Sequence, residues 1–143
     1  MVSSNSFPLS LVIGPGKEHD CRRFKQVVSN IQINTGNGRP RTKPREVLDD
    51  AAYDDESIRS YLRRRWIRSN IPSNKRNQKK PRRGRPTRFE EGSYKKRGAV
   101  ERFFGWIKLR FRRIATRYER LDLCFDGLVR LASFLIVWRK CEF

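Results

Sequence analysis

The sequence predicts an α/β fold, in which short strands alternate with helices and two long helices follow. Residues 45–50 and 66–71 each have the length of a short strand and carry apolar residues, Val47 and Leu48 in the first and Trp66, Ile67 and Ile71 in the second. The segment between them, and a longer stretch from residue 93 onward, carry apolar residues at three- and four-residue steps, as amphipathic helices do. The 143 residues are 36% apolar and include nine Phe, four Tyr and three Trp, which is enough to fill a modest core.

The first third of the chain predicts one strand, one helix and a loop. Phe7 to Ile13 is rich in β-forming residues and ends at Gly14, Pro15 and Gly16, which indicates a strand closed by a turn. Within Glu18 to Ile31, apolar residues recur at helical spacing. Asn34 to Pro44 is rich in Gly, Pro and Arg and is expected to be a loop.

The middle of the chain predicts a strand, a helix and a second strand. Arg45 to Ser57 begins as a short buried strand that ends at two adjacent acids, Asp49 and Asp50, which would be exposed at its carboxyl edge. A helix is expected to run through Ile58, Tyr61, Leu62 and Arg65, and Trp66 to Ile71 forms a further strand halted by Pro72.

The rest of the chain predicts a basic loop and two helices. Ser73 to Gly92 has dense positive charge and no apolar periodicity. A long helix is expected from Ser93, as N-cap, to about Arg120, and a last helix from Phe125 to Arg139 should pack under it. We therefore expect a core region at residues 1–72, a basic loop at 73–92 and C-terminal helices at 93–143.

The charge of the chain points to a polyanionic partner. It has 34 Lys and Arg against 15 Asp and Glu, so its net charge is 34 − 15 = +19, and its pI is near 11.0. Nucleic acid is the first candidate. The alternative is that the basic surface serves solubility or the binding of anionic lipid.

Several other classes of protein are disfavoured. Cys21, Cys124 and Cys141 are widely spaced and His19 is the sole histidine, so neither a disulfide framework nor a zinc site is indicated, and a reducing cytoplasm fits best. The N-terminus does not have the pattern of a secretory signal. The apolar run from Leu128 to Trp138 falls short of the roughly 20 residues that a bilayer requires.

Four polar residues of the long predicted helix carry the candidate chemistry. On a helix turning about 100° per residue, Tyr94, Arg97, Glu101 and Lys108 fall within an arc of roughly 60°. An apolar stripe lies beside them and should anchor the helix to the core: Val100, Phe103, Phe104, Ile107, Phe111, Ile114 and Tyr118.

Asp50 and Glu101 are the acids with the best positions for a metal site, because Mg²⁺ prefers carboxylate oxygens that converge from separate elements. Spacing alone leaves an alternative open. Glu101 would then form a salt bridge with Arg97, and Asp49 or Asp50 would cap the following turn.

The order of these residues resembles the insertion-sequence DDE transposases of prokaryotes. Asp50 is followed by Tyr53 and Asp54, and Tyr94, Arg97, Glu101 and Lys108 match the Tyr-Arg-Glu-Lys signature of that family. The surrounding segments PLSLVIGPGKEHD, RSNIPSNKRN and RFEEGSYKKRGAVERFFGWIKLRFRRIATRYERL are also similar, so the resemblance extends from about Phe7 to Trp138.

The resemblance implies a ribonuclease H-like core that uses two Mg²⁺ or Mn²⁺ ions to cleave DNA at element ends and transfer the strand. Asp50 would be the second catalytic Asp and Glu101 the final Glu, and both would bind metal. It further implies that Arg97 and Lys108 contact DNA phosphates or the transposon end and that Tyr94 positions the strand. Arg112, one helical turn beyond Lys108, would extend the phosphate track.

The sequence also departs from the family. No residue matches the first catalytic Asp or the N-terminal DNA-binding region, and Asp20 matches a non-catalytic Asp. We therefore expect a partial or split polypeptide that works as a homo-oligomer or with an upstream transposase half, in the cytoplasm with the nucleoid. Alone, it should bind DNA without cutting it. The alternative is a non-catalytic DNA-binding remnant or an inhibitor of transposition.

Two weaker signals also concern DNA. PRRGRP, which contains Arg83 and Arg85, resembles an AT-hook that enters a narrow minor groove; the alternative is a flexible loop touching phosphates without preference. Trp106 lies off the apolar stripe and is therefore a candidate for stacking on unpaired bases.

Overall fold

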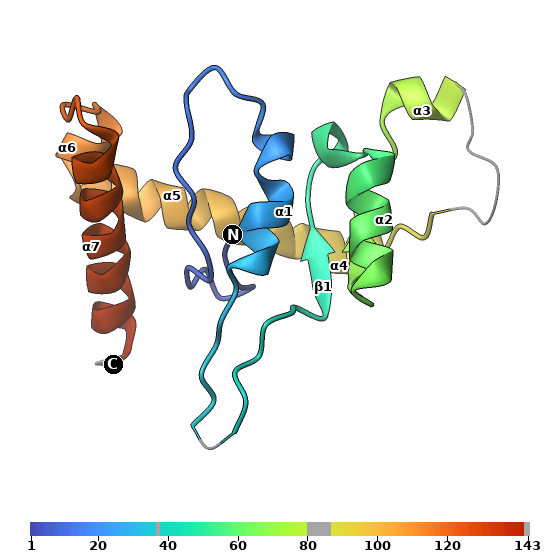
Figure 1. The fold of residues 1–143 in the computed structure, drawn as a ribbon, viewed down its shortest axis with the longest axis horizontal. Coiled ribbons are helices and arrows are strands. Elements are labelled where there is room, and N and C mark those ends of the chain that lie inside the picture. The colour runs from blue at the N-terminus through green and yellow to red at the C-terminus, as the bar shows by residue number, and fades with distance from the viewer. Residues whose placement is uncertain (37, 80–86, 142–143) are drawn as a thin grey trace. The chain divides into compact units, whose positions relative to one another are not determined.

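The computed structural model describes residues 1–36, 38–79 and 87–141 (Figure 1). The chain forms two compact units. We call Lys17–Arg97 the sheet unit, and Met1–Gly16 together with Gly98–Phe143 the helical unit. Helices and a two-stranded parallel sheet are both present, so the predicted α/β class is confirmed.

The sheet unit is built on a strand–helix–strand motif. Strand β1 (Glu46–Leu48) leads through a 3-10 turn (Ala51–Tyr53) to helix α2 (Glu56–Arg64), and strand β2 (Arg68–Asn70) returns parallel to β1. Val47 lies opposite Ser69 in the register. Both strands and the helix between them were predicted at these places, and the structure confirms them.

Local chemistry explains why α2 forms where it does. Asp55 is its N-cap, and its Oδ1 accepts a hydrogen bond from the Ser57 amide at 2.8 Å. Ile58 and Leu62, four residues apart, turn one face of the helix into the core. Helix α1 (Phe24–Ser29), preceded by a 3-10 turn (Asp20–Arg22), packs on α2 and confirms the helix predicted between Glu18 and Ile31. The buried apolar residues of the unit are Phe24, Val28, Ile31, Val47, Ile58, Leu62, Ile67 and Ile71.

The basic segment after β2 is not wholly irregular. Residues Lys75–Lys79 form a short helix, α3, within the predicted loop. Its start is held by Asn74 and Asn77, whose side chains and backbone bond to Asp54 and Ala51. Arg83 and Arg85 lie outside the described residues, so the AT-hook hypothesis remains a prediction.

The helical unit contains α5 (Gly98–Arg110), α6 (Arg112–Ala115) and α7 (Asp122–Cys141). Phe103 and Ile107 of α5 pack with Ile136 of α7, and partly buried apolar residues surround this cluster: Val2, Leu11, Trp106, Phe111 and Ile114. The prediction that the last helix packs on the one before it is confirmed. None of the helices in the described part of the chain is long and apolar enough to cross a membrane.

The strand predicted from Phe7 to Ile13 is wrong. The described N-terminal residues contain only an isolated antiparallel bridge between Val2 and Pro8, closed by a turn in which buried Ser6 adopts φ 63°. Pro8 has no amide hydrogen to offer a ladder, and no second strand pairs with this segment in the described structure.

The single helix predicted from Ser93 to Arg120 is also wrong. Helix α4 (Glu91–Tyr94) and a 3-10 turn (Lys95–Arg97) precede α5, and the chain leaves helical geometry again at Phe111 (φ −125°, ψ 73°). Ser93 is not the N-cap, because it lies inside α4 and its hydroxyl donates a hydrogen bond to Glu46 Oε2 at 2.6 Å. Phe111 packs its ring against the core of the helical unit.

Candidate active site

Asp50 lies two residues beyond β1 and caps the turn that follows. Its Oδ1 accepts a hydrogen bond from the Ala52 amide at 2.9 Å, so the capping role left open by the spacing is confirmed. The cap occupies one oxygen only. The side chain is 47% exposed, and its Oδ2 lies 3.7 Å from Nη1 of Arg97. Asp50 therefore presents one oriented carboxylate oxygen beside a cation.

Arg97 and Tyr94, the first half of the signature, belong to the same unit as Asp50. The Arg97 guanidinium lies over the Tyr94 ring, 5.9 Å from its centroid, and the centroid of the Phe89 ring lies 5.1 Å from that of Tyr94. The aromatic face restricts the guanidinium at the point where it approaches Asp50. Tyr94 is thus a support for Arg97, while contact of either residue with DNA remains a prediction.

The segment carrying Tyr94 and Arg97 is tied to both strands. Asn70 of β2 donates from Nδ2 to the Glu90 carbonyl at 2.8 Å and accepts from the Glu90 amide at 3.0 Å. Ser93 bonds to Glu46 of β1, and Arg68 forms ion pairs with Glu46 and Glu90. The position of Arg97 near Asp50 therefore depends on side-chain bonds across 20 to 47 residues of sequence.

Asp49 is the residue whose setting the sequence did not reveal. Burial, and then repulsion from Asp50, raise the pKa of Asp49 to about 7. Burial of the Cys21 thiol, and then repulsion from Asp49 and Asp50, raise its pKa, and its Sγ donates to the Ala52 carbonyl at 3.3 Å. Burial and the nearby acids also raise the pKa of Tyr53 above its usual value. In the sequence, the signal that could have pointed to this setting of Asp49 was the presence of two adjacent acids after a buried strand.

Asp54 is the second residue that sequence reasoning missed, because it was taken only as part of the family pattern. It is buried and pairs with Arg59 at 2.6 Å, with side-chain exposures of 2% and 4%. Arg59 also donates to the Ile71 carbonyl, and Asp54 accepts from the Asn74 amide and the Asn77 side chain. This network fixes the turn after Asp50 to α2 and to the start of α3.

Glu101 and Lys108 lie on α5 in the helical unit, and both are exposed. Seven residues of helix bring them to one face, about 10 Å apart along the axis. The wider prediction, a stripe of four residues on one continuous α-helix, is wrong because the 3-10 turn Lys95–Arg97 precedes α5 and the unit boundary falls after Arg97.

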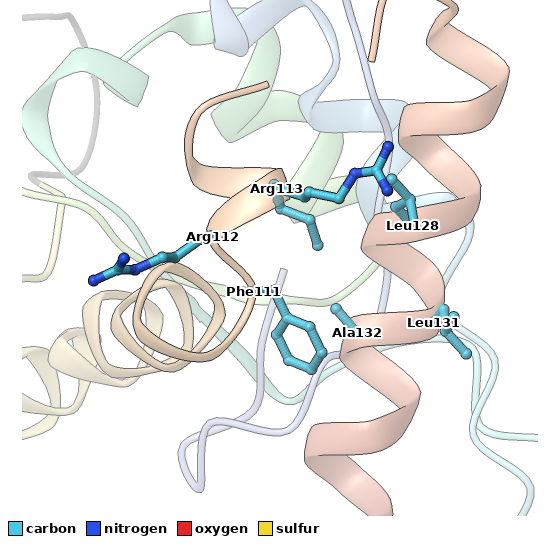
Figure 2. A pocket seen from close by; sticks show the side chains of 7 residues that line it. Phe111, Arg112, Arg113, Leu128, Leu131 and Ala132 are labelled. Carbon is cyan, nitrogen blue, oxygen red and sulfur yellow. The ribbon is translucent and has the colours of Figure 1, made fainter. Parts of the chain in front are cut away.

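Arg112 does not follow Lys108 on one continuous helix, so the prediction is wrong in that respect. It begins α6 after the break at Phe111. Figure 2 shows Phe111 beside Ala132, and Arg112 and Arg113 extended toward opposite sides. The hollow here, of about 370 Å³, is lined mainly by apolar side chains such as Ile114, Leu128 and Leu131. Arg112 remains exposed and able to meet a phosphate from α6.

Trp106 is not an open platform for a base. It packs partly buried against the core of the helical unit, and Nζ of Lys140 lies 3.7 Å from its ring centroid. The same Nζ lies 5.2 Å from the Phe7 ring and bonds to the Asn5 carbonyl. The stacking hypothesis did not foresee that Lys140, distant in sequence, lies over the Trp106 ring.

The carboxyl groups beside Arg97 are of the chemical type that a divalent cation prefers as ligands. Asp50 offers an exposed carboxylate oxygen, and Asp49 places a second carboxyl directly before it in the chain. Magnesium takes one or two carboxylates from a protein and completes its shell with water and phosphate. Among the described residues no three His, Cys, Asp or Glu side chains are grouped as a metal site.

Comparison with known proteins found a matching family and similar proteins. Residues 1–133 match the family described as Transposase DDE domain. A Brucella ovis protein with the provisional name of transposase for insertion sequence element IS6501 is 31% identical over 136 residues, covering 95% of this chain and 92% of that protein. A Burkholderia cepacia protein, provisionally named transposase for IS402, is 29% identical over 139 residues, 96% of this chain and 60% of that protein. No solved structure matches the chain significantly.

Proposed function

The chain belongs to the transposase DDE-domain family, and from this premise we propose that it acts on DNA in the transposition of an insertion sequence, with a ribonuclease H-like core. The observation that carries the proposal is the contact between Asp50 and Arg97. These residues come from the two parts of the family pattern and are 47 residues apart in sequence. Their contact gives a structural reason for the pattern.

Asp50 and Glu101 are proposed to hold Mg²⁺ or Mn²⁺. When bound, two such ions activate the attacking oxygen and stabilise the leaving one. Asp50 would use the carboxylate oxygen not engaged by Ala52. Arg97, held by Tyr94, would bind the phosphate next to that carboxylate, and its charge would offset the repulsion between a phosphate and an acid.

Further cations would hold the DNA on either side of the reacting phosphate. Lys108 of α5 and Arg112 of α6 are exposed and suited to phosphate contacts, and Arg83 and Arg85 are proposed for the same role. Tyr94 would position the strand only indirectly, through Arg97. Such contacts orient the duplex without reading its sequence.

The sequence supplies matches to two of the three acids that the family uses. We therefore propose that this polypeptide alone binds DNA but does not cleave it, and that it functions as a homo-oligomer or with another transposase half, in the cytoplasm at the nucleoid. Magnesium-dependent cleavage of DNA by the purified chain would contradict this proposal.

A measurement of Mn²⁺ binding tests the proposed site. Asp50→Asn keeps an N-cap for the turn, because Asn caps as well as Asp, but it removes the charge. We expect Asp50→Asn to weaken Mn²⁺ binding at least tenfold in a paramagnetic relaxation titration, while DNA affinity stays equal or rises slightly. Glu91→Gln removes an exposed acid from α4 and is the matched control. Equal Mn²⁺ binding by Asp50→Asn and wild type would exclude Asp50 as a ligand.

The second candidate function is that of a non-catalytic DNA-binding protein or an inhibitor of transposition. It is favoured by the lack of a three-ligand metal group among the described residues. If it is correct, the wild-type chain binds DNA but its affinity for Mn²⁺ is no greater than that of Asp50→Asn. The same titration thus separates the two candidates.

A further inference from the structure

A hairpin in the sheet unit carries a cluster of cations to which the family pattern assigns no role. Ile33 and Arg41 exchange backbone hydrogen bonds, from the Ile33 amide at 3.0 Å and from the Arg41 amide at 2.9 Å. Gly36 and Gly38 adopt φ 86° and 127°, which glycine allows in a tight reversal. We call residues 32–45 the basic hairpin; it is the long loop between α1 and β1 in Figure 1.

The base of the basic hairpin is anchored to the core of its unit. Ile31, directly before it, is fully buried, and Val47 of β1, shortly after it, is 3% exposed. Arg65, the C-cap of α2, lies over the Tyr61 ring and donates from Nη2 to the Thr42 carbonyl at 3.4 Å. Beyond this base, all described residues from Gln32 to Lys43 are exposed. The basic hairpin is therefore an exposed segment whose base is anchored to the core of the sheet unit.

The charge of the basic hairpin is of one sign only. Between Gln32 and Arg45 there are four cations, Arg39, Arg41, Lys43 and Arg45, and no Asp or Glu. None of the four forms an ion pair within the described structure. Other arginines of the sheet unit are paired, among them Arg23, Arg59, Arg63, Arg68 and Arg97. Six acids of the unit pair with these arginines, Glu18, Glu46, Asp50, Asp54, Glu56 and Glu90, and the hairpin is left strongly cationic.

The spacing of the four cations of the basic hairpin suits contacts with the phosphates of a DNA duplex. The four cations occupy every second position from Arg39 to Arg45, so a short length of chain carries cations for several phosphates, which rise about 3.4 Å per step along one DNA strand. Pro40 and Pro44 favour extended backbone in the residues before them. Unpaired like charges repel one another and weaken the fold, so solubility alone does not explain their concentration in one projection.

We propose that the basic hairpin is a second contact site for duplex DNA, in which Arg39, Arg41 and Lys43 bind backbone phosphates. It rests on the proposed function, which identifies DNA as the polyanion. The hairpin enters β1 at Glu46 and Asp50 follows the other end of that strand, so the two sites are separated by about 10 Å of strand. A single turn of DNA, about 34 Å long, can reach both.

The salt dependence of DNA binding tests this inference in the full chain. The triple variant Arg39→Gln, Arg41→Gln, Lys43→Gln is compared with a control that removes three exposed cations of the helical unit, Arg120→Gln, Arg130→Gln, Arg139→Gln. The readout is fluorescence anisotropy of a labelled duplex across a salt series. Each lost phosphate contact lowers the slope of log K against log salt by about 0.9. In the hairpin variant we expect the slope to fall by about 2 to 3 and the affinity for DNA to fall at least tenfold. In the control we expect the slope to change by less than about 1.

Amide exchange adds a local readout. Bound DNA is expected to slow exchange at the hairpin amides, including Ile33 and Arg41. Equal slopes for the hairpin variant and the control, absence of hairpin protection, or an effect confined to duplex RNA would each overturn the inference. Such results leave the proposed function standing if wild type still binds duplex DNA and Asp50→Asn still loses Mn²⁺. If wild type binds no duplex DNA at any salt concentration, the hairpin inference and the proposed function both fail.

Discussion

At the scale of single residues, the sheet unit stabilises the turn after Asp50 with a buried polar network. Arg59 reaches across α2 to Asp54 and to the Ile71 carbonyl, so three segments share one guanidinium. Burial alone would raise the pKa of Asp54, but hydrogen bonds from Asn77, Asn74 and Arg59 outweigh it and hold that pKa below its usual value. Asp54 is therefore charged in the folded protein at neutral pH.

Removing the charge of Asp54 should destabilise the fold. Asp54→Asn leaves Arg59 buried without its ionic partner, and breaking one half of a buried pair costs about 3 kcal/mol or more. The free energy of unfolding, measured with urea at pH 7, checks this value. Asp55→Asn on the exposed neighbour keeps a capping side chain and is expected to change stability by less than about 1 kcal/mol.

The pH dependence of stability provides an independent test of the same network. Because the folded pKa of Asp54 is lowered, its contribution is complete above the unfolded value near 3.9 and is lost as pH falls through the folded pKa. Wild type should thus lose more stability than Asp54→Asn between pH 5 and about pH 3. Parallel curves for the two proteins would show that Asp54 does not titrate with an altered pKa.

At the scale of elements, prediction succeeded where neighbours in sequence determine the structure. β1, α2 and β2 are specified by local signals, namely the apolar residues within the two strand segments, the Asp55 cap and Pro72, and Asp50 could be placed after a strand for that reason. The break at Phe111 could not be predicted, because the apolar spacing continues across it. The cover of Trp106 by Lys140 and the ties of Glu90 and Ser93 to the strands depend on residues distant in sequence.

The packing of α5 on α7 can be tested through two adjacent phenylalanines. Phe103 is fully buried in the core of the helical unit, whereas Phe104 is 49% exposed. Phe103→Ala should lower the free energy of unfolding by about 3 to 5 kcal/mol, since it leaves a cavity. Phe104→Ala is the matched control and should cost about 1 kcal/mol or less, for its ring contact with Phe103. Similar losses in urea unfolding would contradict the observed orientation of α5.

At the scale of the whole molecule, positive charge is unevenly shared. The sheet unit has 24 Lys and Arg against 10 Asp and Glu, and the helical unit has 10 against 5, so their net charges are +14 and +5. Most of the charge that favours a polyanion thus accompanies Asp50, Arg97 and the basic hairpin. Repulsion among these cations weakens the fold in the absence of a partner.

Salt should therefore stabilise the free protein. Raising the ionic strength from about 0.01 M to about 0.15 M shortens the screening length from about 30 Å to about 8 Å and weakens this repulsion. We expect Tm in calorimetry to rise by a few degrees, and to rise further with short duplex DNA if DNA binds the folded state as proposed. A fall in Tm with salt would mean that the ion pairs of the sheet unit outweigh its repulsion.

The pairing of Asn70 with the backbone of Glu90 also affects how molecules of this chain behave toward one another when they are crowded. An uncovered strand edge is a template on which a strand of a second molecule can add, and such additions lead to fibres. The side-chain amide of Asn70 holds the backbone of Glu90 beside the end of β2. A second molecule whose strand extended past that end of β2 would therefore meet the Glu90 segment.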